Sequence, residues 1–153
     1  MTVRLPRFRV LAFFLGCGIL IGACSTTDPK TVPTNLTAGQ LMKNAQVANS
    51  EDDYENAQVY FNLVKARFAS DEAVCIEADY NLADILYKTG KFAPARIAFA
   101  ALIDRYKKPG AERLPPFIPT LAERIIKQMD EIEIKNLPPS PAPVDQPTTA
   151  SSR

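Results

Sequence analysis

Cysteines are the strongest nucleophiles in this 153-residue chain, and the sequence contains no histidine that could activate them. Histidine is the commonest general base and a frequent metal ligand, so its absence argues against acid–base catalysis and against a metal site. None of the six glycines forms the G-x-x-x-x-G-K pattern of a phosphate-binding loop. We therefore expect a protein that is not an enzyme and that uses no cofactor. The three cysteines, Cys17, Cys24 and Cys75, carry the remaining chemistry.

The first cysteine lies in a segment typical of secretion. Residues 1–9 carry three arginines and no acid, and residues 10–21 are almost wholly apolar. That run is too short for a comfortable membrane span, which needs about 20 residues. A basic start, a short apolar run and small residues at its end indicate a signal peptide. Cys17 would be removed with it.

The end of the apolar run, Ile21-Gly22-Ala23-Cys24, resembles the lipobox of bacterial lipoproteins. The resemblance implies cleavage between Ala23 and Cys24 and attachment of lipid chains, such as palmitate, to Cys24. Each buried methylene of such a chain contributes about 0.8 kcal/mol to membrane binding. Ser25, rather than an aspartate, follows the cysteine, and in sorting of the enterobacterial type this implies transit to the outer membrane. A plain signal peptide or an uncleaved anchor with an incidental cysteine is the alternative.

Charge and composition restrict what the mature chain could bind. Removing residues 1–23, the expected signal peptide, leaves 15 basic residues against 17 acidic ones, a net charge of −2. Such a balance predicts no nucleic-acid partner. Residues 24–37, rich in Thr, Ser and Pro, are predicted to form the lipidated N-terminus and a flexible linker. Cys75 would then be the only remaining thiol, either packed as a small apolar residue or available for an intermolecular disulfide or redox chemistry.

An internal repeat with an offset of 38 residues organises the middle of the chain. The repeated motif combines aromatic, alanine and aliphatic residues at spacings of 3, 4, 3 and 4, which places them on one face of a helix. Its two copies are Tyr54-x-x-Ala57-x-x-x-Phe61-x-x-Val64-x-x-x-Phe68 and Phe92-x-x-Ala95-x-x-x-Phe99-x-x-Leu102-x-x-x-Tyr106.

A helix is predicted before each copy, and each helix pair would meet at small residues. Ala45 with Ala57 and Ala83 with Ala95 would let two helices approach closely. Gly90 and its counterpart Asp52 would supply the left-handed residue between the helices. The neighbouring acids Glu51, Asp53 and Glu55 lack the spacing of a calcium loop and are interpreted as helix caps.

This arrangement resembles the tetratricopeptide repeat over residues 41–108, with four more residues than the usual period of about 34. The resemblance implies an all-α fold of two helical hairpins stacked as a short solenoid. Residues 120–135 are predicted to form a capping helix, with an apolar stripe at Leu121, Ile125, Met129 and Ile132 and a polar outer face. We therefore expect a helical domain over residues 38–136 and a disordered tail rich in Pro, Ser and Thr over residues 137–153. An unrelated helical bundle is the alternative.

In tetratricopeptide stacks the first helix of each hairpin lines a concave groove, which implies a set of candidate partner-binding residues. By position they are Met42, Gln46, Asn49, Tyr80, Asp84, Tyr87 and Lys88. The two tyrosines are of a type enriched at protein interfaces. The Lys–Asn pair that grips a carboxylate in some of these proteins is missing, since Met42 and Gln46 stand at those positions.

The lipobox, the short linker and the repeats together resemble the BamD family of barrel-assembly lipoproteins. That family has more repeats than this chain has room for, and its second helices commonly end in Tyr-Pro, where this chain has Phe68-Ala69 and Tyr106-Lys107. The resemblance implies a lipid-anchored interaction scaffold on the periplasmic face of the outer membrane, with other envelope proteins, including barrel-assembly subunits, as partners. A pilotin-like or secretion-type escort, a lipoprotein that binds small hydrophobic ligands, and a structural envelope protein are the alternatives.

Overall fold

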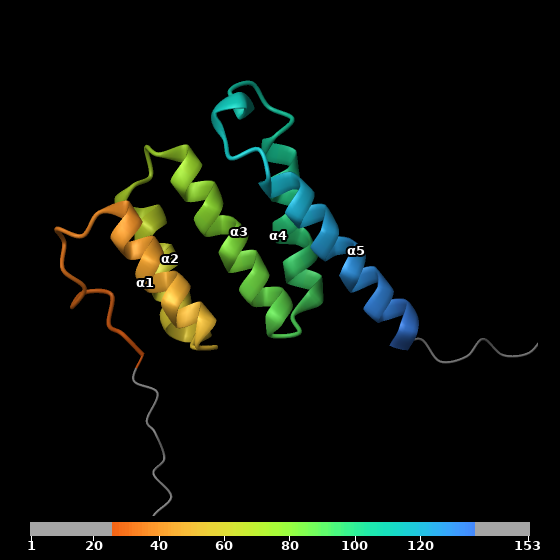
Figure 1. The fold of residues 1–153 in the computed structure, drawn as a ribbon, viewed down its shortest axis with the longest axis horizontal. Helices are drawn as coiled ribbons and strands as arrows, with labels where there is room; N and C mark the ends of the chain where they lie inside the picture. Colours follow the sequence, from red (N-terminus) through yellow and green to blue (C-terminus); the bar gives the residue numbers. More distant parts are fainter. Residues whose placement is uncertain (1–25, 137–153) are drawn as a thin grey trace, which may run out of the picture.

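The computed structural model describes residues 26–136, and helices are the only regular secondary structure in this part of the chain (Figure 1). The predicted all-α class is confirmed for these residues, which contain no strand. The signal peptide, Cys24 and the predicted tail lie outside them. The five α-helices are α1 (Ala38–Ser50), α2 (Tyr54–Arg67), α3 (Glu72–Lys88), α4 (Phe92–Arg105) and α5 (Ile118–Asn136), and a single 3-10 turn, η1 (Ala111–Arg113), precedes α5.

Side-chain caps begin the first three helices. Thr37 and Gln40 form a reciprocal capping box at the start of α1. Asp53 accepts a hydrogen bond from the backbone N–H of Asn56 at the start of α2, and Asp71 caps α3 in the same way. The interpretation of the acidic group as a helix cap is therefore confirmed at Asp53.

The two hairpin turns have the same backbone geometry, 38 residues apart. Asp52 and Gly90 both adopt left-handed conformations, with φ of 58° and 74°. The N–H of the next residue then donates to the carbonyl five residues earlier, Asp53 to Ala48 at 2.9 Å and Lys91 to Leu86 at 2.8 Å. These bonds satisfy carbonyls that the helix end would leave open. The predicted equivalence of Asp52 and Gly90 is confirmed.

The predicted alanine contacts lie at the centre of each hairpin. Ala45, Ala57 and Ala95 are fully buried and Ala83 is 1% exposed. α1 packs on α2 and α3 packs on α4, and small buried side chains such as these alanines let helices approach closely. The equivalent aromatic residues Phe61 and Phe99 are also fully buried and fill the space beside each crossing.

The helix α3 joins the two hairpins into one core. Ala78 and Ile85 pack with the buried residues of α1 and α2, whereas Ile76 and Ala83 pack with those of α4 and α5. Because α3 contributes to both clusters, neither hairpin buries its apolar surface alone.

The last helix, α5, follows the second hairpin as α3 follows the first. It contacts α4 and α3, as α3 contacts α2 and α1. Ile125 and Met129 of the predicted stripe are buried, but Leu121 and Ile132 are only half-buried. Ile118 and Ala122 complete the buried stripe instead, because the helix begins two residues earlier than predicted and has Pro119 in its first turn, which tolerates proline.

Residues 26–36, called here the N-terminal strap, lie along α2. Val32 is only 5% exposed and packs in the first hairpin's core. The guanidinium of Arg67 donates to the carbonyls of Pro33 at 2.7 Å and Val32 at 2.9 Å. At the other end of α2, Thr26 Oγ1 donates to Glu55 at 2.7 Å. The prediction of a flexible linker over residues 24–37 is therefore wrong for the described part.

Replacement of glycine by alanine should have opposite effects at two positions. At Gly90 the added Cβ meets no atom, but the left-handed φ disfavours any L side chain, so Gly90→Ala should lower the free energy of unfolding by about 1–2 kcal/mol. Gly39 lies in α1 in open space, so Gly39→Ala should raise it by up to about 1 kcal/mol. Urea unfolding followed by circular dichroism measures both changes. A free energy of unfolding for Gly90→Ala equal to or above that of the wild type would contradict the turn geometry.

Candidate functional site

Some of the predicted groove residues of α1 and α3 contact one another on the surface. Lys88 Nζ lies 2.8 Å from Asp84 Oδ2 and 3.5 Å from Asn49 Oδ1 of the neighbouring helix. Gln46 is exposed one turn before Asn49. The packing thus brings together side chains that are 39 residues apart in the sequence. We call this surface the α1–α3 face, and its residues are Gln46, Asn49, Tyr80, Asp84, Tyr87 and Lys88.

Met42 does not belong to this surface, and its prediction as a groove residue was wrong. The side chain is only 7% exposed and packs in the core of the first hairpin with Leu41 and Ala45. An unbranched apolar side chain gains free energy by entering the core, whereas Tyr80, its repeat counterpart, also carries a hydroxyl. A partner on this face would therefore not contact Met42 in the folded protein.

The two tyrosines of the face are half-buried because their rings pack within the second hairpin. Tyr80 lies against Phe99 with ring centroids 5.8 Å apart and planes tilted by 60°. Tyr87 stacks on Phe92 at the same centroid distance. Only the exposed part of each tyrosine side chain could contact a partner. The two residues therefore contribute both to the packing of the hairpin and to the surface.

Electrostatics link the face to α5. Burial raises the pKa of Tyr80 above its ordinary value of 10.0, and the charge of Asp84 raises it further. Arg124 of α5 acts in the opposite direction, so this cation lies within electrostatic range of the Tyr80 phenol. The sequence predicted a polar outer face for the capping helix, but it gave no sign that Arg124 lies near Tyr80. Because α5 follows the second hairpin as α3 follows the first, this equivalence could have predicted that α5 lies close to Tyr80 of α3.

The chemistry available on the face is binding by hydrogen bonds, ion pairs and aromatic contact. Within residues 26–136 no three His, Cys, Asp or Glu side chains cluster as a metal site would require. Among the same residues, every buried side-chain polar atom has a hydrogen-bond partner. None of the described helices is long and apolar enough to cross a membrane.

The thiol of Cys75 is half-buried at the start of α3 and lies 3.4 Å from the carbonyl of Phe68. Partial burial raises the pKa of this thiol, and the carboxylates of Asp79 and Asp71 add to the shift. A raised pKa lowers the thiolate fraction, which is the reactive form. These observations favour the interpretation of Cys75 as a packed residue over that of a redox thiol.

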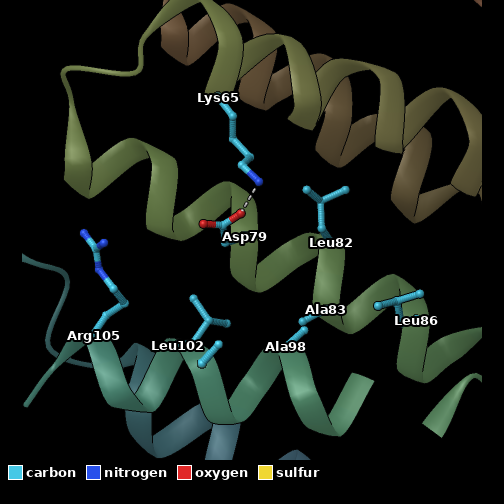
Figure 2. Close-up of a pocket in the computed structure, with 9 residues that line it drawn as sticks. Lys65, Asp79, Leu82, Ala83, Leu86, Ala98, Leu102 and Arg105 are labelled. Atoms are coloured by element: carbon cyan, nitrogen blue, oxygen red, sulfur yellow. Dashed lines mark ion pairs between the residues drawn. The ribbon is translucent and has the colours of Figure 1, made fainter. Parts of the chain in front are cut away.

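A concave feature, the inter-hairpin crevice, lies between α2, α3 and α4 (Figure 2). It encloses about 380 Å³, and Leu82 and Leu86 of α3 line it together with Leu102 of α4. One end is charged, where Lys65 of α2 forms a 2.6 Å ion pair with Asp79 of α3. The sequence allowed a small hydrophobic ligand between the repeats but identified none of the lining residues, because they come from three helices in two different hairpins.

Arg105 lies at the same charged end of the crevice (Figure 2). Its guanidinium also pairs with Glu72 of α3. Each cation of the crevice is thus already matched by a carboxylate. A ligand in the crevice would therefore bind mainly through contact with the apolar walls, and not through an unpaired charge.

Comparison with known proteins finds one relevant similarity. An uncharacterized protein of Treponema pallidum (strain Nichols) is 31% identical over 115 residues, which cover 75% of this chain and 45% of that protein. The chain thus spans less than half the length of this relative. No protein-family model matches the chain, and no solved structure matches it.

The ring and the hydroxyl of Tyr80 should contribute separately to stability. Tyr80→Phe keeps the contact with Phe99 and should change the free energy of unfolding little at pH 7, whereas Tyr80→Ala should lower it by about 2 kcal/mol or more. Because the folded-state pKa of Tyr80 is raised, its stabilising contribution is present below about pH 10 and is lost as the pH rises through the folded-state value.

Above about pH 10, Tyr80→Phe should therefore lose less stability than the wild-type protein. Urea unfolding at neutral and alkaline pH measures the difference. Parallel pH profiles for the two proteins would contradict the buried environment assigned to this phenol.

Proposed function

We propose that the chain is a membrane-anchored protein-interaction scaffold of the bacterial cell envelope, built from two tetratricopeptide-like hairpins that stack as a short solenoid under a capping helix. The observation that carries this proposal is the recurrence of one hairpin at a 38-residue offset. The left-handed turn at Asp52 recurs at Gly90, and buried Phe61 recurs as buried Phe99. Stacked repeats of this kind present extended surfaces suited to binding proteins.

The α1–α3 face is the proposed partner-binding surface. It combines a polar group, Asn49, Asp84 and Lys88, with the partly exposed rings of Tyr80 and Tyr87. Tyrosine offers apolar contact and a hydroxyl at a low entropy cost, which suits protein recognition. The proposal does not include catalysis, a cofactor or a nucleic-acid partner.

An accessory role in outer-membrane β-barrel assembly is the specific form of the proposal. It is supported by the resemblance of the lipobox and the repeats to the BamD family, and it would place the protein on the periplasmic face of the outer membrane. Depletion of the protein should then lower the levels of outer-membrane barrels. Unchanged barrel levels would reject this role and favour a pilotin-like escort or a structural role, with the scaffold proposal intact.

Binding of a small hydrophobic ligand is a second candidate function, favoured by the inter-hairpin crevice. Its volume of about 380 Å³ falls within the range of small-molecule sites, about 300–1,000 Å³. Mass spectrometry of protein purified from membranes tests this function. A co-purifying molecule that is lost in Ala101→Trp, on the crevice wall, but kept in the neighbouring Ala100→Trp would support it. Ligand-free protein in every preparation would reject it.

Loss of Cys24 should remove the lipid from the protein. Cys24→Ala should abolish incorporation of a palmitate analogue, because the thiol that carries the acyl chains is missing. Cys17→Ala is the matched control, since this cysteine lies in the predicted signal peptide and should leave the labelling unchanged. Equal labelling of the wild type and Cys24→Ala would contradict the lipobox assignment.

A charge placed on the α1–α3 face should reduce partner binding. Gln46→Arg adds a bulky cation at an exposed position of α1, whereas Ala100→Arg adds it at an exposed position of α4. In affinity purification of the lipidated protein from detergent-extracted membranes, a partner recovered with the wild type and with Ala100→Arg should be depleted with Gln46→Arg. Equal recovery with both variants would exclude this face as the binding surface.

A further inference from the structure

The N-terminal strap shows how the domain would sit on a lipid surface. We propose that the strap holds the stack directly against the bilayer in one orientation, with the hairpin turns facing the lipid headgroups. This inference rests on the proposed lipid anchor at Cys24. The hairpin-turn end is defined here as the α1–α2 turn at residues 51–53, the α3–α4 turn at residues 89–91 and the last turn of α5.

The strap runs parallel to α2 and is fixed at both ends of that helix. Thr26 Oγ1 bonds Glu55, and the backbone N–H of Thr27 donates to the side chain of Asn56, both in the first turn of α2. The carbonyls of Val32 and Pro33 accept from Arg67 in the last turn. The start of the strap is therefore held at the hairpin-turn end, where Figure 1 shows it level with both turns.

The strap is also stiffened between these two fixed ends. The backbone N–H of Lys30 donates to Asp28 Oδ1 at 2.9 Å. Both the N–H and the hydroxyl of Thr31 donate to the carbonyl of Asp28, at 2.9 and 2.8 Å. With this internal turn and the buried Val32, the strap is part of the folded domain, so the position of Thr26 is set by the domain itself.

Covalent geometry then limits the distance between the anchor and the domain. Cys24 precedes Thr26 by two residues, and a chain spans at most about 3.5 Å per residue, so the two Cα atoms lie within about 7 Å of each other. A free linker over residues 24–37 would instead give a root-mean-square separation of about 20 Å. The lipid would therefore hold the first turn of α2 at the membrane surface.

The charge of the hairpin-turn end is uneven, and its acidic side depends on the covalent anchor. Glu51, Asp52, Asp53 and Glu55 lie beside the start of the strap, and anionic headgroups repel them unless the lipid holds them in place. On the other side of the same end, Lys91 and Lys135 are exposed cations, and Ile134 is 71% exposed. Anionic lipids attract exposed lysines, so the lipid would hold the acidic side and charge would hold the basic side.

In this orientation the helices point away from the bilayer surface, and the α1–α3 face is accessible to a partner from the side of the domain. The 14 residues of α2 rise by about 21 Å. The opposite end of the stack, with Ala69 in the α2–α3 connection, would therefore lie about 20 Å farther from the headgroups than Lys91. That difference is large enough to measure with labels placed at the two ends.

The experiment uses the full lipidated protein in phosphatidylethanolamine–phosphatidylglycerol vesicles that contain a headgroup-quencher lipid. In a Cys75→Ser background, a fluorophore is attached through Ala93→Cys, beside the α3–α4 turn at the hairpin-turn end, or through Ala69→Cys at the opposite end, both exposed positions. We expect several-fold stronger quenching at position 93 than at position 69. Equal quenching, or stronger quenching at position 69, overturns the proposed orientation.

A tether variant separates the strap from the anchor. A Gly-Ser insertion of about 12 residues between Ser25 and Thr26 leaves the fold untouched but frees the domain, and it should remove the difference between positions 93 and 69. If the difference persists unchanged with the insertion, the strap does not set the orientation and the inference fails. The mass of the same preparation reports lipidation. Protein without lipid overturns the anchor itself, whereas lipidated protein with equal quenching overturns only the orientation.

Discussion

The close approach of two helices at buried alanines is the constraint on which this structure depends. Ala45 meets the second helix of its hairpin near Ala57, and Ala83 and Ala95 repeat the contact, all with 1% exposure or less. A larger side chain at such a crossing would force the helices apart, at a typical cost of about 1–3 kcal/mol. With the helices this close, one left-handed residue is enough to connect them. The fully buried phenylalanine of each hairpin then fills the remaining space.

The proposed function follows from the inability of a single hairpin to bury its own apolar surface. One hairpin leaves an apolar side uncovered, so α3 packs into both cores and α5 covers the second hairpin. First helices placed side by side in this way bring Asn49, Asp84 and Lys88 together, and Arg124 comes within electrostatic range of Tyr80. The same packing leaves an apolar crevice between the hairpins. The proposed binding surfaces would therefore arise from the packing of the helices, with no catalytic group required.

Local signals made the hairpins predictable from the sequence, whereas contacts between distant segments were not. The turns at Asp52 and Gly90 and the buried alanines could be predicted because each depends on residue type and helical spacing. Met42 was misplaced because the choice between core and surface depends on which neighbour fills the adjacent space. The strap was misread because its Thr, Ser and Pro content resembles a linker, while the group that fixes it, Arg67, lies 34 residues beyond Pro33.

Experimental structure determination of the domain, by crystallography or NMR, tests the stacked repeat most directly. The rotation and translation that superpose α1–α2 on α3–α4 should bring Asp52 onto Gly90 and should also carry α3 onto α5. This result would establish one repeated unit that continues into the last helix. A structure in which that operation carries α3 away from α5, or in which the two turns fail to superpose, would contradict the repeat and the scaffold function built on it.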